Sequence, residues 1–272
     1  MKLTVLGASG GTGREVVRQA VAAGHEVTAV VRKGARSLTA APGAVSADGA
    51  ARGAKGRGGR GGEARAGHGG GARGGEGRGG GGRGGGAGGV REAGYGGGRG
   101  RLAVTTVADV TDPAALGPVV TGRDALLFCP GLESPRPPGR LGAAAHALVR
   151  AARAAGVRRL LVVSSSPVGP LPPDEGVLGR AVSPVLRAVF KDVYAEAAAM
   201  ESELVHSGLD WTVLRPGKLT NRRGKGRYRR RVGGNLPDKG TLARADLARA
   251  VLDLLDDPAV RGRTVGLGSA RG

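Results

Sequence analysis

Apolar and polar positions alternate along this chain in blocks that predict strands and helices in turn. The first apolar run, Lys2–Leu6, predicts a short strand. Four apolar residues then recur at the helical period: Val16, Val17, Ala20 and Val21. Gly24 stands where such a helix ends, and the β-branched run Glu26–Val31 predicts a second strand. The first 31 residues therefore predict a strand, a helix and a parallel strand.

The same alternation resumes after residue 101. Further strands are predicted over Leu102–Val107, Asp124–Cys129, Arg159–Val163, Asp210–Leu214 and Arg263–Leu267. Helices are predicted from Pro113 (with Thr111 or Asp112 as the cap) and over Leu141–Ala155, Lys191–Ser207 and Ala243–Leu255. Strands that alternate with helices predict an α/β fold, a doubly wound parallel sheet covered on both faces. Ligands of such sheets bind at the carboxyl ends of the strands.

Three glycines occupy the turn between the first strand and the first helix. Gly7, Gly10 and Gly13 follow G-x-x-G-x-x-G spacing. One permits a tight turn, one lets the backbone approach a pyrophosphate, and one lets the helix pack closely on the sheet, with its N-terminus facing the anion. Because strand, helix and strand frame these glycines, we interpret the turn as a dinucleotide site in a Rossmann-type sheet. The alternative is a glycine-rich turn that binds nothing.

The end of the second strand distinguishes between the two nicotinamide coenzymes. It reads Val30-Val31-Arg32-Lys33 and holds no Asp or Glu. A carboxylate there would bind the ribose 2′-hydroxyl of NAD, whereas Arg suits the 2′-phosphate of NADP. We therefore predict NADP, as NADPH, in preference to NAD, with a solvated basic loop as the alternative.

The segment 43–101 differs in composition from the rest of the chain. It holds 29 of the 55 glycines and eleven Arg or Lys against four acids. With almost no large apolar side chains it cannot offset its ordering entropy, so we interpret it as a disordered Gly/Arg-rich insert. Residues 1–42 and 102–268 are then the two parts of a single domain, with a C-terminal substrate region.

Cysteine content and hydropathy narrow the class of protein further. Cys129 is the one cysteine, which excludes an intrachain disulfide and fits a reducing compartment. No apolar run approaches the roughly 18 residues that cross a bilayer, and the N-terminus enters a strand at once, without a signal peptide. No metal-ligand cluster is evident. We expect a cytoplasmic protein that is a monomer or a homodimer and acts on a small molecule.

Five motifs, taken together, resemble those of one protein family. They are GASGGTG at 7–13, VVRK at 30–33, ADVTDP at 108–113, VVSSS at 162–166 and SGLDWTVLRPGKLT at 207–220. With them the chain resembles the atypical short-chain dehydrogenases/reductases, in the NAD(P)H-binding branch of NmrA-like proteins and the flavin/biliverdin reductase. The resemblance covers about 1–42 and 102–268.

This resemblance implies a role for several residues. The pyrophosphate would be wrapped by Gly7, Ala8, Ser9, Gly10, Thr12 and Gly13, and Arg32 would meet the 2′-phosphate. The adenine would touch Asp109 and Val110, and the nicotinamide ribose would pass over Pro130 and Gly131. The nicotinamide itself would lie near Ser164 and Ser165, with its carboxamide held by the backbone after Pro216. The alternative roles are structural: Asp109 beginning a helix, and the serines satisfying strand-end amides.

The chain departs from the wider family in its catalytic residues. Typical members carry Tyr-x-x-x-Lys, but Tyr194 is followed four residues later by Ala198, and Lys191 precedes it. We therefore expect no such dyad, and take Ser165 and Tyr194 as the candidate catalytic residues. Hydride transfer by proximity needs orientation more than a protein acid.

Two basic stretches raise the possibility of a second partner. Repeats such as RGGRGG in 43–101 resemble RNA-binding tails, although Tyr95 is the one aromatic residue among them. An inert linker, or a misread GC-rich coding sequence, explains them equally well. The stretch 222–231 is interpreted as a solvated hairpin, with binding of an anionic substrate or a polyanion as the alternatives.

Three functional hypotheses remain open. The first is an NADP-dependent oxidoreductase that reduces a small planar acceptor, flavin-like or quinone-like. The second is a regulatory protein that senses NADP without catalysis. The third is a nucleic-acid-associated protein that acts through the basic insert.

Overall fold

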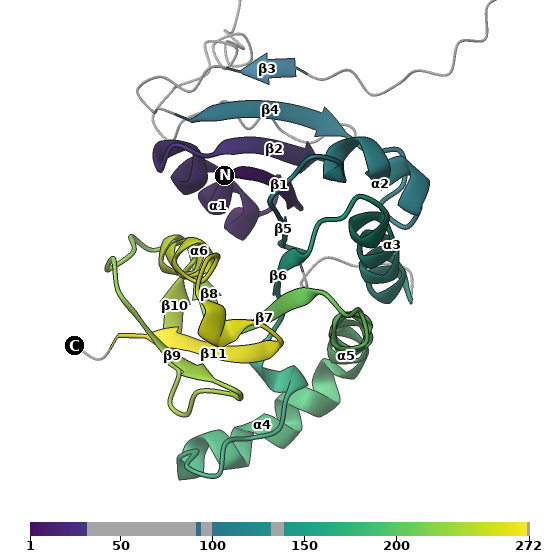
Figure 1. The fold of residues 1–272 in the computed structure, drawn as a ribbon. Helices are drawn as coiled ribbons and strands as arrows, with labels where there is room; N and C mark the ends of the chain where they lie inside the picture. Colours follow the sequence, from purple (N-terminus) through teal and green to yellow (C-terminus); the bar gives the residue numbers. More distant parts are fainter. Residues whose placement is uncertain (32–90, 94–99, 132–138, 271–272) are drawn as a thin grey trace, which may run out of the picture. The chain divides into compact units, whose positions relative to one another are not determined.

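A mostly parallel sheet forms the core of the described part of the chain (Figure 1). The computed structural model describes residues 1–31, 91–93, 100–131 and 139–270. In this part of the chain the main sheet contains β1 Lys2–Leu6, β2 Glu26–Val31, β3 Arg91–Ala93, β4 Arg101–Thr106, β5 Ala125–Phe128, β6 Arg159–Val163, β7 Asp210–Pro216, β9 Tyr228–Val232 and β11 Arg263–Ser269. A separate parallel pair joins β8 Lys218–Thr220 to β10 Thr241–Ala243.

The strand order confirms the predicted fold class. The sheet runs β3-β4-β2-β1-β5-β6-β7-β11-β9, and every pair from β4 to β11 is parallel. β3 and β9 are antiparallel and lie at the two edges. The order of the strands reverses between β1 and β5, which is the point where doubly wound sheets bind their ligands.

Helices cover both faces of the sheet. They are α1 Gly11–Ala22, α2 Pro113–Val120, α3 Arg140–Ala154, α4 Val177–Val189, α5 Lys191–Val205 and α6 Arg244–Asp253, with short 3-10 turns η2 Ser166–Val168 and η3 Pro258–Val260. Alternate residues of β1 enter two cores. Leu3 and Val5 pack with α1 and α6, whereas Leu6 packs with α2, α3 and α5. This alternation is the period of two expected of a strand buried on both faces.

A buried arginine joins the end of α6 to the sheet. The Arg159 guanidinium donates to the Leu254 and Leu255 carbonyls, each at 2.7 Å, which are left without helical partners at the end of α6. It also donates to the Asp210 carbonyl and the Thr212 hydroxyl, both at 2.8 Å. Burial lowers the pKa of Arg159 to about 10. This side chain replaces water at the helix end.

The structure differs from the sequence-based predictions in several places, and the short strands β8 and β10 were not predicted. Within the segment predicted as a disordered insert, Arg91–Ala93 form β3 on the edge of β4. The second basic stretch contributes an edge strand, β9, rather than a separate hairpin, because its residues pair with β11. The helix α4 was not predicted. Among the described residues, no helix is long and apolar enough to span a membrane.

Candidate functional site

The crevice between β1 and β5 lies where the strand order reverses. The two strands are parallel, so the residues after Leu6 and after Phe128 emerge at the same edge of the sheet. The Cys129 amide donates to the Leu6 carbonyl at 2.9 Å, which carries the pairing one residue further. Pro130 and Gly131 follow directly, and the nitrogen of Pro130 would lie 3.6 Å from a Cβ on Gly7. The structure thus brings these predicted site residues together with the glycine motif.

Two glycines of the loop are required by geometry. Gly7 has φ +78°, and a Cβ on it would collide with the Cys129 carbonyl oxygen. A Cβ on Gly13 would collide with the Gly7 carbonyl oxygen and lie 2.9 Å from the Cα of Ala8. The loop therefore folds back on the first turn of α1, and no side chain fits between them.

The first turn of α1 presents open backbone amides. Ala8 and Gly10 already donate, to the carbonyls of Val30 (3.3 Å) and Gly7 (3.0 Å). The amides of the first three helical residues, 11–13, have no acceptor among the residues that the structure describes. The cap residue Gly10 offers no side chain, and the first turn holds no acid. Open amides and an unneutralised helix dipole favour an anion at this end.

These features fit the diphosphate of a dinucleotide. The glycine cradle excludes side chains, Ser9 and Thr12 are half-buried beside it, and Ala8 is fully buried beneath it. Arg32, predicted to meet the 2′-phosphate, lies outside the described residues, so its role stays a prediction. No group of three His, Cys, Asp or Glu residues in the described ranges could hold a metal ion.

Asp109 and Val110 follow the carboxyl end of β4, as predicted. The Asp109 carboxylate accepts from the Thr111 amide at 3.0 Å and from Arg140 at 3.2 Å. The hydrogen bond from Thr111 is the main cause that lowers the pKa of Asp109. Asp112, not Thr111, caps α2 by accepting from the Ala114 amide. Asp109 is therefore an exposed anion beside the helix rather than its cap.

The strand-end serines occupy two different environments. Ser164 is 3% exposed and donates its hydroxyl to Glu201, inside the protein. Ser165 is half-buried, and its hydroxyl makes no hydrogen bond to a described residue. Of these two serines, Ser165 is the one whose hydroxyl can form a hydrogen bond to a ligand.

Pro216 ends β7 and is buried. The amide that follows it, on Gly217, donates to the Leu267 carbonyl at 3.3 Å. The Gly217 amide is therefore already hydrogen-bonded within the sheet. A backbone contact to the nicotinamide carboxamide would have to come from later residues of the segment.

A buried ion pair holds Ser164, and the sequence analysis missed it. Arg215 binds Glu201 through two hydrogen bonds, with Nε at 3.2 Å from Oε1. The two side chains are 12% and 8% exposed. Glu201 lies on α5 and Arg215 on β7, and the Ser164 hydroxyl completes the group. A Glu and an Arg fourteen residues apart carry no motif, so only tertiary packing identifies them.

Tyr194 lies on α5 in partly apolar surroundings. Its ring centroid is 6.1 Å from that of Phe190, and burial raises the pKa of Tyr194. A lysine that activated the tyrosine would shift its pKa in the opposite direction. Lys191 is exposed and makes no hydrogen bond to Tyr194.

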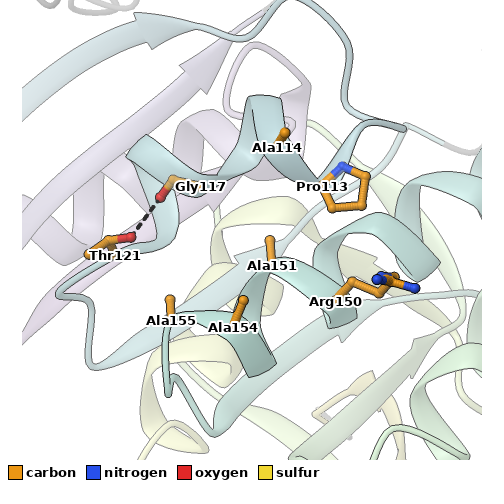
Figure 2. A pocket seen from close by; sticks show the side chains of 8 residues that line it. All are labelled: Pro113, Ala114, Gly117, Thr121, Arg150, Ala151, Ala154 and Ala155. Atoms are coloured by element: carbon orange, nitrogen blue, oxygen red, sulfur yellow. Dashed lines mark hydrogen bonds between the residues drawn. The ribbon is translucent and has the colours of Figure 1, made fainter.

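Two hollows on the surface contain none of the predicted site residues. One, of about 320 Å³, runs between α2 and α3 (Figure 2) and is lined by small residues such as Gly117 and Ala151, with Arg150 at one end. The other, of about 370 Å³, lies at the amino ends of the strands, around Asp124 and Arg159. The glycine crevice lies at the opposite, carboxyl ends of the strands.

Comparisons with known proteins agree with this geometry. A family model described as NAD(P)H-binding matches residues 98–258, more than half of the chain. The glycine loop precedes the matched range. No curated protein matches the sequence.

Solved structures share the fold at low identity. The chain is 20% identical to ChuY, an anaerobillin reductase from Escherichia coli O157:H7, with a TM-score of 0.60, covering 100% of this chain and 98% of that one. A short-chain dehydrogenase/reductase from Veillonella parvula DSM 2008 is 15% identical with a TM-score of 0.64, covering 98% and 94%. A structure from the same organism, of the wide type in complex with NADP, is also 15% identical, with a TM-score of 0.61 and the same coverage.

Proposed function

Because the chain belongs to the NAD(P)H-binding family, we propose that it is an oxidoreductase that binds NADPH in preference to NADH and reduces a small planar acceptor, such as a flavin or a quinone. The observation that carries the proposal is the open first turn of α1. Three amides there have no acceptor among the described residues, beside a turn in which Gly7 and Gly13 leave no room for a side chain, at the reversal of strand order. A diphosphate supplies the acceptors that these amides lack.

The preference for NADPH is supported by the end of β2. Val31 ends the strand and is followed by Arg32 and Lys33, without an acid to bind a ribose 2′-hydroxyl. A guanidinium matches a phosphate through paired hydrogen bonds. The Veillonella parvula neighbour was crystallised with NADP, which agrees with this choice.

The class of electron acceptor is proposed from the side chains near Ser165, where the nicotinamide is predicted to lie. Bound NADPH supplies a hydride, which carries two electrons to the acceptor, and solvent supplies the proton that completes the reduction. Tyr194, with its raised pKa, holds its proton more tightly than an activated acid. An acceptor whose reduction needs only a well-placed hydride, rather than a protein acid, fits these residues best.

A titration of NADPH against NADH tests the binding step, with Arg32→Ala as the variant. We expect the wild type to prefer NADPH, and Arg32→Ala to lose that preference by about tenfold or more, because a charge-assisted contact is removed. Arg18→Ala serves as the matched control, since Arg18 is an exposed arginine paired with Glu15 on α1. Equal affinity of the wild type for both coenzymes would contradict the NADPH assignment.

A second function, sensing of NADP without catalysis, is favoured by the Tyr-x-x-x-Lys pattern that the chain does not complete, since Tyr194 is followed four residues later by Ala198. Consumption of NADPH in the presence of flavin or quinone acceptors separates the two. Turnover with such an acceptor supports the oxidoreductase, whereas binding without turnover across the acceptors supports the sensor. The nucleic-acid hypothesis depends on 43–101, most of which lies outside the described residues. Retention on RNA at physiological salt, lost on deleting 44–100, is its test.

A further inference from the structure

The helix α4 presents apolar side chains to solvent. Its main contacts are with η2 and α5, and in Figure 1 it lies below β9 and α5. Large apolar residues that are between 43% and 86% exposed gather on α4 and the residue after it: Val177, Val182, Val185, Val189 and Phe190. Among the described side chains of the helix, the half-buried ones are Gly179 and Ser183. The helix therefore turns small residues to the protein and leaves its valines uncovered.

The exposed valines form one continuous strip. Val182, Val185 and Val189 follow each other at three and four residues, which sets them on the same face of a helix. Contiguous exposed apolar surface of this kind marks a place where a protein meets a partner or a membrane.

The charges beside this strip are positive. The segment 176–191 contains Arg180, Arg187 and Lys191 and no acid. The exposed Arg180 donates from Nε to the Glu175 carbonyl at 3.0 Å and from Nη2 to the Pro173 carbonyl at 2.5 Å. These acceptors are neutral, so the positive charge of Arg180 remains in place.

The acids on either side of the helix do not neutralise these cations. Asp174 pairs with Arg231 at 2.6 Å, and the buried Glu175 pairs with Lys239 at 3.3 Å. Asp192 lies in the first turn of α5, where it faces the positive end of that helix's dipole. A surface that approaches α4 therefore meets valines flanked by positive charge.

Charge decides between the occupants that could cover these valines. In a two-fold contact between copies of this chain, the cations of one α4 would face the same cations of the other. The formal net charge of +20 repels a second copy further. An anionic lipid surface attracts these charges and accepts apolar side chains, and a basic amphipathic helix is typical of such surfaces.

We propose that α4 docks the protein on the anionic surface of a lipid bilayer. Val182, Val185 and Val189 enter the boundary between head groups and acyl chains, and the cations of the segment 176–191 bind lipid phosphates. The helix lies on the membrane and does not span it.

Membrane docking has a consequence for the site. α4 packs against η2, and the cap residue of η2 is Ser165, near which the nicotinamide is predicted to lie. Docking through α4 would bring that end of the site close to acceptors dissolved in the lipid, such as quinones. The docking itself does not depend on the proposed function, because it is measured without coenzyme.

The experiment is co-sedimentation of the full chain with vesicles of phosphatidylglycerol and phosphatidylcholine in equal parts. We expect binding to these vesicles that weakens as salt rises, and much weaker binding to pure phosphatidylcholine. Val185→Gln/Val189→Gln should lower the partition coefficient about tenfold or more, because two apolar side chains no longer enter the lipid. Lys191→Gln should lower it about fivefold.

Matched controls separate α4 from the rest of the surface. Val205→Gln changes an exposed valine at the end of α5, and Arg153→Gln changes an exposed arginine on α3. Both variants should bind the vesicles like the wild type. Val185→Trp gives a second measurement, since its fluorescence should be quenched by brominated lipids in the vesicles.

Several results would overturn the proposal. Equal binding to pure phosphatidylcholine removes the role of charge. Binding that Val185→Gln/Val189→Gln leaves unchanged assigns the vesicle contact to the basic segment 43–101 instead. A wild-type dimer that the same double variant dissociates makes a second copy the occupant of α4. Should the double variant not fold, Val185→Trp decides, and absence of quenching refutes docking. A wild type that binds vesicles but neither coenzyme contradicts the proposed function alone.

Discussion

Gly13→Ala tests the glycine cradle most directly. The added Cβ would meet the Gly7 carbonyl oxygen and would lie 2.9 Å from the Cα of Ala8. Carbon atoms in ordinary contact lie about 3.5 Å apart, so the loop and the helix must separate by about 0.6 Å or more. Both neighbours are backbone, and neither can rotate away as a side chain would.

The size of the effect follows from this displacement. Overpacking of a close contact costs about 1–3 kcal/mol, which exceeds the gain of about 0.5–1 kcal/mol that Ala normally brings to a helix. The net free energy of unfolding should therefore fall slightly. Binding should suffer more, because the amides of the first turn move relative to the loop. We expect NADPH affinity to fall about tenfold or more.

Gly117→Ala is the matched control for this substitution. Gly117 lies inside α2, and apart from its two chain neighbours a Cβ there meets nothing within 4 Å. The control should keep its affinity for NADPH, but its gain in stability is offset because Pro118 follows directly and its ring crowds a Cβ on the preceding helical residue. Urea unfolding and an NADPH titration measure both quantities for both variants. If Gly13→Ala is as stable as the wild type and binds NADPH as tightly, the close approach of loop and helix is not a requirement.

Two further predictions concern stability. Arg159→Met leaves four hydrogen-bond acceptors without their donor, so it should lower the free energy of unfolding, measured in urea, by about 2–4 kcal/mol. Arg158→Met is the control, because the side chain of Arg158 is 69% exposed, and it should change that free energy by less than about 0.5 kcal/mol. Equal losses in the two variants would contradict the buried role of Arg159. Burial raises the pKa of the Cys129 thiol from 9.0 to about 12. Since the folded value lies above the unfolded one, this contribution to stability is complete below pH 9.0 and is lost as the pH rises toward about 12. Stability of the wild type relative to Cys129→Ala should therefore decline over that interval, and a flat difference would argue against burial of the thiol.

The elements that the sequence predicted best are those with local causes. β1 and β2 match their predicted ranges, because uninterrupted apolar runs between turn residues specify buried strands. The start of α2 followed from Asp112 and Pro113, which act on their own helix. The missed helix α4 has apolar residues at the helical period, but it contains Pro184, which argues against a helix when only the sequence is considered, and its valines are exposed rather than buried.

By itself the sequence determined the alternation of strands and helices and the glycine turn, since dihedral preferences and short-range periodicity depend on neighbouring residues. Tertiary structure alone decided which serine hydroxyl is engaged by Glu201, where the basic strand β9 pairs, and that Arg159 binds the carbonyls at the end of α6. These contacts join residues that are far apart in the chain. They arise because strand pairing places distant residues side by side, and no spacing in the sequence encodes that registration.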